Sequence, residues 1–410
     1  LIGAVFITRK ASLIFEKLQN FLDRINVILR ENITGVRVIR AFNKERYEEQ
    51  RMRRSFEDYA ESSIKANRLF FGLESLAFFV MNICIVGILW LGGNRIGAGQ
   101  MEIGDITALT EYAILILFYV IMAQMVIILL PRAKVCMGRI NDVLSHNPEI
   151  TDGTENANIK QLPEVCRFQT VDFRFADADE ATLQGLNFSL RRGETTAIIG
   201  STGSGKSTIA KLLLRFHDVS KGKINLNGED IRNITQEELR QRIAYVPQKA
   251  WLFSGTIADN LRYGNENATE EDMLHALSIA QADFVNELPD GLYSRVAQGG
   301  TNFSGGQKQR LAIARALMKK ADLYIFDDSF SALDFKTDAA LRHALSVEVK
   351  DSAVLIVAQR VNTIVNAEQI IVLEDGKTVG IGSHKQLLET CPIYRDIAKS
   401  QARGGELGGK

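Results

Sequence analysis

Two long apolar runs constrain this chain more than any other feature of its sequence. Phe70–Leu91 is 22 residues long and carries one charged side chain, Glu74, and Ile106–Leu130 is 25 residues long and carries one, Glu111. About 20 helical residues cross a hydrocarbon core about 30 Å thick, so each run is long enough to span a membrane. The alternative is a buried helical hairpin of a large soluble protein, although such helices are usually shorter.

The charges around these runs predict their orientation. The segment between them, Gly92–Asp105, is short and rich in glycine, with one basic and two acidic side chains. Basic residues gather outside the two runs: Arg51, Arg53, Arg54, Lys65, Arg68, Arg132, Lys134 and Arg139. Because Lys and Arg are enriched on the cytoplasmic side of membrane helices, we expect the glycine-rich loop outside and both flanks in the cytoplasm.

The residues before the first run predict a long amphipathic helix. Apolar side chains recur at three- and four-residue spacing over residues 18–33 and 36–42, interrupted only by Gly35. The opening segment Leu1–Ile7 is apolar but too short to span, and we interpret it as the cytoplasmic end of a membrane helix that starts earlier. The predicted arm descends from the bilayer, turns, and climbs back into the first apolar run.

Composition excludes some classes of protein. Lys and Arg total 49 and Asp and Glu total 49, so the net charge of zero argues against a nucleic-acid binder. No C-x-x-C pair occurs among the four cysteines, Cys84, Cys136, Cys166 and Cys391. A disulfide framework or a zinc site is therefore not expected.

The second half of the chain has the pattern of an α/β domain. Short apolar runs alternate with helical patterns at Thr196–Ile199, Ile243–Val246, Leu323–Phe326, Val354–Ala358 and Ile370–Leu373. Strands separated by helices predict a largely parallel core sheet. The expected organisation is a membrane part (1–146), a polar linker (147–165), an α/β domain (166–403) and a flexible tail (404–410).

A phosphate-binding loop follows the first of these strands. The pattern G-x-x-x-x-G-K-[ST] is matched by Gly200, Ser201, Thr202, Gly203, Ser204, Gly205, Lys206, Ser207 and Thr208. Its backbone N–H groups and the next helix would hold the phosphates of ATP, with Lys206 reaching the β- and γ-phosphates and Ser207 binding Mg²⁺. Asp327, at the end of an apolar strand, is the matching Mg²⁺ ligand. A glycine-rich turn without nucleotide is the alternative.

A third motif, Phe303–Gln307, opens a predicted helix with one serine and two glycines. With this motif the chain resembles an ATP-binding cassette exporter half-transporter: an all-α transmembrane part, then an α/β ATPase domain with a helical subdomain. The resemblance implies that the signature motif, Ser304, Gly305, Gly306 and Gln307, binds ATP. It also implies that Gln248 is the Q-loop residue at the metal and the reacting phosphate, that Ser331–Asp334 is the D-loop, and that Phe175 stacks on adenine.

The membrane part carries a family pattern as well. Glu31–Phe42 with Glu45 resembles the stretch after the family's second coupling helix, which implies a coupling helix near Lys17–Leu22. The two apolar runs would be the fifth and sixth of six spans, so four helices are expected to precede this chain. Implied partners are a second half-transporter and the bilayer, in a multi-pass protein of the cell membrane with its ATPase domain in the cytoplasm.

Two residues depart from the family pattern at the catalytic position. The family places Glu after the Mg²⁺-binding Asp, where this chain has Asp328, and His on the switch loop, where it has Gln359. Glutamine can donate a hydrogen bond but cannot take up a proton as imidazole does. Each change alone could be neutral drift. Together they predict a degenerate site of low activity, in a chain whose intact signature motif serves a heterodimeric partner.

The leading functional hypothesis is therefore an ATP-driven exporter subunit for a small amphiphilic substrate, drug-like or lipid-like. The alternatives are an ATP-gated regulatory or channel-like subunit, a peptide exporter, and a soluble cassette protein acting on DNA or ribosomes. The spans and the zero net charge count against the last. Polar residues within the spans could contact substrate or only bond between helices: Glu74, Asn82, Glu111 and Gln124.

Overall fold

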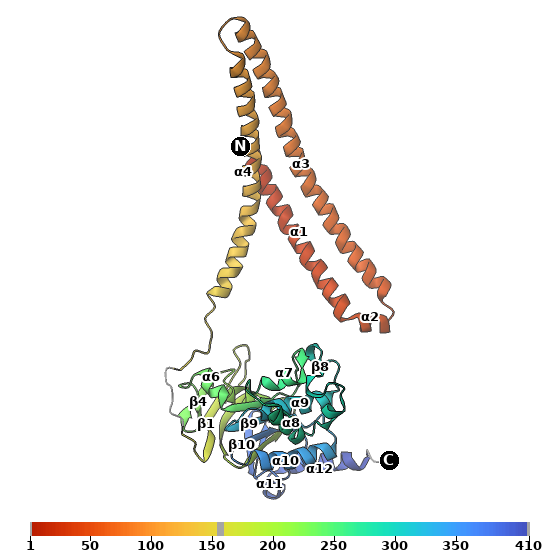
Figure 1. Ribbon diagram of the computed structural model, residues 1–410, viewed down its shortest axis with the longest axis vertical. Helices are drawn as coiled ribbons and strands as arrows, with labels where there is room; N and C mark the ends of the chain where they lie inside the picture. The colour runs from red at the N-terminus through yellow and green to blue at the C-terminus, as the bar shows by residue number, and fades with distance from the viewer. Residues whose placement is uncertain (1, 154–159, 408–410) are drawn as a thin grey trace. The chain divides into compact units, whose positions relative to one another are not determined.

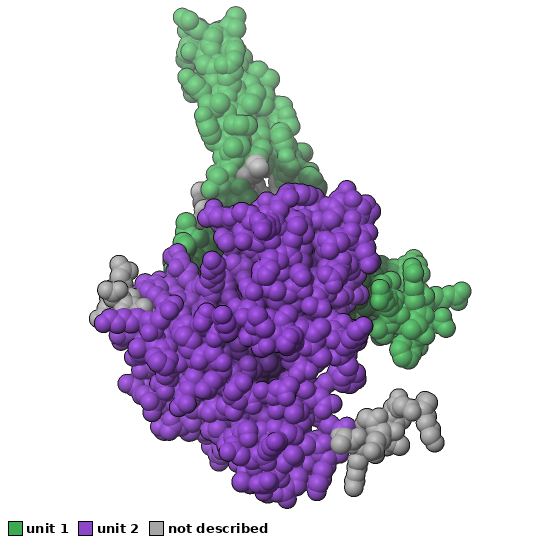
Figure 2. Space-filling model, turned by 60° about the horizontal axis from the view of Figure 1, so that its bottom comes forward, with its two compact units in different colours: residues 1–147 green, residues 148–410 purple. Residues whose placement is uncertain are grey.

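The computed structural model describes residues 2–153 and 160–407. The chain divides into two compact units, Leu1–Asn147 and Pro148–Lys410, which Figure 2 shows in green and purple. The first unit is helical and the second contains all the described strands. This division confirms the predicted order of a helical part followed by an α/β domain.

The first unit consists of long helices joined by short turns (Figure 1). They are α1 (Ile2–Thr34), α2 (Val36–Ala41), α3 (Glu45–Gly97) and α4 (Ile103–Leu144). Helix α3 contacts both α1 and α4. The predicted arm that descends, turns and climbs back therefore corresponds to α1, α2 and the first part of α3.

The turn of this arm lies later in the chain than the sequence suggested. A coupling helix was expected near Lys17–Leu22, but α1 runs unbroken through these residues. The reason is local, because residues 8–34 contain neither glycine nor proline to end the helix. The chain reverses instead at Gly35, α2 and the residues up to Lys44.

Ionic contacts join α1 and α3 next to this turn. The Arg51 guanidinium lies 2.8 Å from a Glu31 carboxylate oxygen and 3.4 Å from one of Glu48. The Asn32 side-chain amide donates to Glu48 as well. Since these groups are partly exposed, each pair contributes at most about 1 kcal/mol, and their main effect is to set which residues of the two helices face each other.

Two stretches of α3 and α4 are long and apolar enough to cross a membrane, Glu74–Gly97 and Ile103–Ala123. Of the residues in these two stretches, only Gly92 is buried against the rest of the described chain. This exposure excludes the alternative of core helices packed within this unit. The loop predicted at residues 92–105 is shorter than expected, because α3 continues to Gly97 and α4 begins at Ile103.

The second unit is built on a six-stranded sheet in the order β12-β11-β3-β10-β9-β6. Strands β11, β3, β10, β9 and β6 are parallel and β12 is antiparallel. The strands are β3 (Thr195–Gly200), β6 (Ile243–Val246), β9 (Leu323–Asp327), β10 (Ala353–Val357), β11 (Gln369–Glu374) and β12 (Lys377–Gly382). All five predicted apolar runs are strands of this sheet, and every residue of β9 and β10 is buried, as expected for a parallel sheet covered on both faces.

A second sheet was not predicted. It is antiparallel, in the order β2-β1-β4-β5: β1 (Glu164–Phe173), β2 (Leu183–Arg191), β4 (Lys221–Leu226) and β5 (Glu229–Asp230). The rings of Phe168 and Phe188, paired across β1 and β2, stack with their centroids 4.3 Å apart. A short ribbon is formed by β7 (Gly255–Thr256) and β8 (Arg295–Val296).

Helices surround the two sheets (Figure 1). They are α5 (Lys206–Leu213), α6 (Gln236–Gln241), α7 (Ile257–Arg262), α8 (Glu270–Ile279), α9 (Gly305–Leu317), α10 (Phe335–Glu348), α11 (His384–Thr390) and α12 (Pro392–Leu407). Short 3-10 helices are η1 (Asp283–Glu287), η2 (Gly291–Tyr293), η3 (Gln298–Gly300) and η4 (Val361–Thr363).

The structure describes part of the predicted linker and part of the predicted flexible tail, and residues 154–159 of the linker lie outside the described residues. In the linker, the Thr151 carbonyl accepts a hydrogen bond from Arg215, and the Asp152 carboxylate accepts two from Gln236. A Cβ on Gly153 would clash with the Asn233 carbonyl oxygen, so only glycine fits there. At the other end, α12 continues through residues 404–407, and residues 408–410 of the predicted tail lie outside the described residues.

Candidate nucleotide site

The loops that follow β3, β9 and β10 meet at one edge of the six-stranded sheet. Because these strands are parallel, their carboxyl ends share this edge, which is where α/β sheets bind ligands. The edge carries the phosphate loop after β3, Asp327 and Asp328 at the end of β9, and Gln359 after β10. Residues far apart in the sequence are thereby brought into one cluster.

The phosphate loop wraps around a buried lysine. The Lys206 ammonium group donates hydrogen bonds to the Gly200 carbonyl at 2.9 Å and the Ser201 carbonyl at 2.7 Å. Burial lowers the pKa of Lys206, while the nearby carboxylates of Asp328 and Asp327 act to raise it. The Ser204 hydroxyl is buried and has no hydrogen-bond partner among the described residues. A loop with a buried cation and an unsatisfied hydroxyl fits a phosphate ligand.

Asp327 lies beside Ser207, and oxygen atoms of the two side chains could bind the same metal ion. The Ser207 hydroxyl donates to one carboxylate oxygen of Asp327 at 2.8 Å, and the Tyr245 hydroxyl donates to the other at 3.4 Å. Burial raises the pKa of Asp327, and these two hydrogen bonds act to lower it. Burial and the carboxylate of Asp327 raise the pKa of Tyr245 to about 12, so Tyr245 stays a donor. Hydroxyl and carboxylate oxygens are hard ligands of the kind that Mg²⁺ takes.

Asp328 is held between two glutamines. Gln248 and Gln359 each donate a side-chain amide hydrogen bond to the same carboxylate oxygen of Asp328, at 3.0 and 2.9 Å. The backbone of Asp328 has a positive φ of 48°, and its N–H donates to the Val357 carbonyl at the end of β10. Asp328 therefore contacts both of the other residues expected at the reacting phosphate.

Phe175 lies next to the phosphate loop through a chain of contacts. The register of β1 and β2 pairs Phe173 with Leu183, and the Leu183 side chain lies against Gly205. The ring of Phe175 meets that of Phe173 edge-on at 4.8 Å and that of His217 at 5.2 Å. Phe175 is only partly buried, so part of its surface is accessible.

The signature residues form a second cluster at the start of α9. Ser304 accepts a hydrogen bond from the Gln307 N–H, and the Gln307 side chain accepts one from the Ser304 N–H. A Cβ on Gly306 would lie 3.2 Å from the Ala332 carbonyl, so the motif rests against the D-loop. Ser304 and Gly305 are exposed, and no hydrogen bond joins Ser304–Gln307 to the phosphate-loop cluster within residues 160–407.

One residue that the sequence did not single out links the two clusters. Gln309 on α9 is 3% exposed, and its side-chain amide donates to the Pro247 carbonyl, next to Gln248, at 3.2 Å. Gln309 thus ties the signature helix to the Q-loop. A polar residue on the otherwise apolar buried face of α9 was the available signal.

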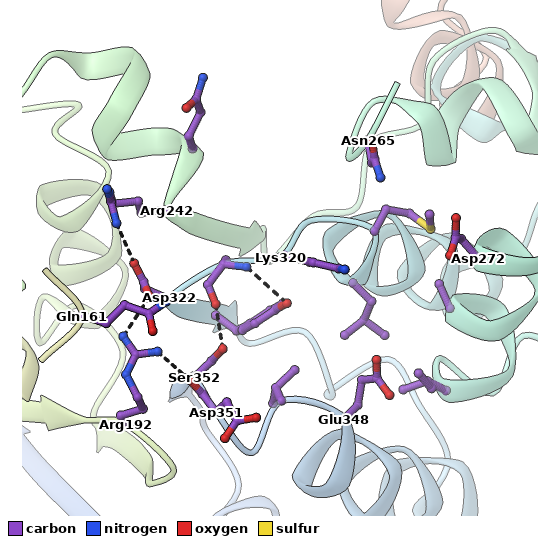
Figure 3. A pocket seen from close by; sticks show the side chains of 18 of the residues that line it. Gln161, Arg192, Arg242, Asn265, Asp272, Lys320, Asp322, Glu348, Asp351 and Ser352 are labelled. Carbon is purple, nitrogen blue, oxygen red and sulfur yellow. Dashed lines mark hydrogen bonds and ion pairs between the residues drawn. The ribbon is translucent and has the colours of Figure 1, made fainter. Parts of the chain in front are cut away.

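A pocket of about 980 Å³, drawn in Figure 3, is lined by residues at the opposite edge of the sheet. Its lining includes residues just before β6, β9 and β10, so it is separate from the nucleotide loops. The Asp322 carboxylate in its wall accepts hydrogen bonds from Arg192, Arg242 and Asn227. These bonds join the two sheets, which gives the buried carboxylate a structural role.

Three polar residues of the spans, Glu74, Asn82 and Glu111, share no hydrogen bond with one another in the described part of the chain. Glu74, Asn82 and Glu111 are exposed, and the Asn82 amide donates to the Phe78 carbonyl of its own helix. The side chain of Gln124 lies outside the described residues. Contact of these residues with substrate therefore stays a prediction.

The arrangement of these motifs is shared with known proteins. Residues 183–331 match the family described as ABC transporter, and residues 1–121 match the ABC transporter transmembrane region. An uncharacterized ABC transporter ATP-binding protein of Mycobacterium bovis is 42% identical over 402 residues, which cover 97% of this chain and 69% of the relative. The chain belongs to the ABC transporter family.

Two further similarities define the kind of ABC transporter. The chain is 33% identical to the ATP-dependent lipid A-core flippase of Desulfotalea psychrophila, over 94% of this chain and 67% of the flippase. A solved structure of a bacterial Atm1-family ABC exporter with ATP bound superposes with a TM-score of 0.85 at 29% identity, covering 98% of this chain and 71% of that one. The resemblance to an ABC exporter half-transporter is confirmed: the chain is an ATP-driven membrane exporter subunit with a cytoplasmic ATPase domain.

Two glycines of the ABC phosphate loop offer a matched test of its packing. Gly205 and Gly203 have positive φ values of 92° and 88°, so alanine is strained at both. A Cβ at Gly205 would also lie 2.5 Å from Leu183, whereas one at Gly203 meets open space. We expect Gly205→Ala to reduce unfolding stability by about 1–3 kcal/mol more than Gly203→Ala. Denaturant unfolding of the ATPase domain within the intact chain measures the difference, and equal losses would contradict contact with Leu183.

Proposed function

We propose that this chain is the degenerate-site subunit of a heterodimeric ABC exporter of small amphiphilic molecules. Its own site binds MgATP and turns it over slowly, and its signature motif completes the working site of the partner subunit. The observation that carries the proposal is the position of Asp328, whose carboxylate is shared by Gln248 and Gln359.

Neither glutamine can supply the proton chemistry that hydrolysis needs. A carboxamide donates and accepts hydrogen bonds but does not take up a proton near neutral pH. Asp328 could act as a base, but its side chain is one methylene shorter than that of glutamate. A misplacement of about 1 Å can reduce a rate on the order of a hundredfold. The cluster is therefore better suited to holding a terminal phosphate than to activating water beside it.

The residues for binding MgATP are all present. We assign the phosphates to the phosphate loop with Lys206, the metal to Ser207, Asp327 and Gln248, and the adenine to Phe175. When bound, Mg²⁺ neutralises negative charge on the phosphate oxygens. The buried Ser204 hydroxyl and the paired oxygens of Ser207 and Asp327 support this assignment.

The signature motif is built to act outside its own site. Ser304 and Gly305 are exposed at the N-terminus of α9, which has 13 residues. The N–H groups at a helix N-terminus attract anions, so an ATP presented by a second ATPase domain is a suitable ligand. An intact donor surface on a chain with a weak site of its own favours two different subunits over two identical ones.

For the membrane part, we assign the coupling role to the turn around α2 in place of Lys17–Leu22. This turn exposes apolar side chains, with Val38 61% and Phe42 70% exposed. The exposed apolar faces of α3 and α4 suit packing against further helices and lipid in a multi-pass protein of the cell membrane. Similarity to a lipid A-core flippase supports an amphiphilic, lipid-like substrate.

Retention of nucleotide tests the proposal. The full-length chain paired with its partner is loaded with labelled MgATP and chased with unlabelled MgATP, and the label on each subunit is followed over time. We expect this subunit to keep its label after the partner has lost its own, and to release it when EDTA removes Mg²⁺. If both subunits lose label at the same rate, the degenerate site is ruled out.

A further inference from the structure

The C-terminal helix α12 reaches the switch segment of the nucleotide site. Gln401 on α12 donates from its amide nitrogen to the Gln359 carbonyl at 2.7 Å, and its amide oxygen accepts from the Val361 N–H at 2.8 Å. One side chain thus bonds to the backbone on both sides of Arg360, with donor and acceptor both used. Nothing in the sequence connects these residues, which lie about 40 positions apart.

Helix α12 is well placed to hold this contact. Tyr394 is fully buried, and Ile397 and Ala398 are partly buried against the core of the ATPase domain. Gln401 follows Tyr394 by seven positions and Ile397 by four, so it lies on the same face of the helix. The Tyr394 hydroxyl is also 2.7 Å from a ring nitrogen of His384 on α11. The helix is thereby fixed at the point from which Gln401 extends.

Other contacts hold this segment on either side of Gln359, and the Val361 side chain is buried in the hydrophobic core. The Ala358 N–H donates to the Ile198 carbonyl of β3, and the Thr363 carbonyl accepts from Arg342. Between these points lies Gln359, whose side chain donates to Asp328. Gln401 bonds to the backbone of Gln359 itself. A shift of that backbone would therefore move the Gln359 side chain directly.

We propose that Gln401 is a positioning residue, which sets the switch segment so that the Gln359 side chain stays at Asp328 and the terminal phosphate position. The inference rests on the proposed nucleotide site and adds the C-terminal helix to it. Loss of Gln401 loosens the switch segment and shortens the time for which this site retains MgATP. Loss of hydrogen bonds of this kind is expected to change the release rate of MgATP from this subunit by roughly threefold to tenfold.

A double-mutant cycle in the assembled transporter tests this. Release of labelled MgATP from this subunit is measured for Gln401→Ala, Gln359→Ala and the double variant, with Lys399→Ala as the control at an exposed neighbouring position of α12. We expect Gln401→Ala to speed release about threefold to tenfold in the native chain. We expect it to have little further effect once Gln359 is alanine, because the two residues act in series.

A second variant separates positioning from folding. Glutamate at position 401 can still accept from the Val361 N–H but has no proton to donate to the Gln359 carbonyl. Gln401→Glu should therefore keep the melting temperature of the native chain and release nucleotide about as fast as Gln401→Ala. Additive effects of the Gln401 and Gln359 substitutions, or unchanged release in Gln401→Glu, would overturn the inference. Fast turnover at the native site would contradict the degenerate site while leaving this coupling measurable.

Discussion

Gly305→Asp in this chain is expected to remove nearly all ATPase activity of the assembled transporter. If Gly305 faces the ATP of the partner, a carboxylate there opposes the charge on the transferred phosphate and displaces a preorganised donor. Loss of one such donor typically costs about 2.7–4 kcal/mol, a hundred- to thousandfold in rate. The measurement is steady-state ATP hydrolysis by the variant paired with an unmodified partner.

The local structure makes misfolding a poor explanation for this loss. A Cβ at Gly305 meets open space, and an acidic residue in the first turn of α9 is favourable to the helix. Gly305→Asn is the matched control, since it has the same shape without the charge and should keep much more activity. Ser304→Ala should lose part of the activity, because it removes the hydroxyl that caps the helix.

Asp328→Asn provides the contrast within the same chain. Asp328 belongs to the site that we propose to be slow, so most of the ATPase activity of the complex should remain. If Asp328→Asn proves as damaging as Gly305→Asp, then the site formed by this chain is a working catalyst and the heterodimer proposal is wrong.

The second large effect is a gain of activity. Asp328→Glu combined with Gln359→His should restore the family's residues on both sides of the terminal phosphate and raise turnover at this site by up to about a hundredfold. The label lost per minute from this subunit in the chase experiment measures it. The positive φ of 48° at position 328 is less favourable for glutamate, so we expect a loss of about 1–2 kcal/mol in stability.

Each single substitution serves as a control for the pair. Asp328→Glu alone lengthens the acidic side chain but leaves the carboxamide of Gln359 in place. Gln359→His alone supplies an imidazole but leaves the shorter acidic side chain of Asp328. Both should give smaller gains than the pair. A double variant that binds MgATP and still releases it at the native rate would show that these two departures do not limit turnover.

The residues that bind nucleotide could be predicted because their arrangement is local. Gly200 to Thr208 follow one another along the chain, and Asp327 ends a strand that is apolar throughout. The parallel sheet then brings these segments to one edge. The short apolar runs of the sequence were sufficient to predict that sheet. Contacts between distant segments could not be read in this way. Gln309 and Pro247 are separated by 62 positions, and nothing in either segment indicates the other.

The turn of the helical arm was misplaced for a different reason. The resemblance of Glu31–Phe42 to the family's stretch after a coupling helix implies a turn before it, although Gly35 within it is the first glycine after a long run without helix breakers. A helix that ends at this glycine predicts the reversal where the structure has it, at residues 35–44. The sheet of β1, β2 and β4 was missed because its strands mix buried and exposed residues irregularly, with register shifts along β1.

The hydrogen bond of Thr151 fixes the length of free chain between the end of α4 and the ATPase domain. Helix α4 ends at Leu144, and Thr151 is already bonded to Arg215 of the ATPase domain. Seven residue steps separate these points, and a fully extended chain covers at most about 25 Å over that length. As long as Thr151 stays bonded, about 25 Å is the greatest length that this free segment can reach in any conformation of the transporter. A longer free segment requires the bond between Thr151 and Arg215 to break or α4 to unwind from its end.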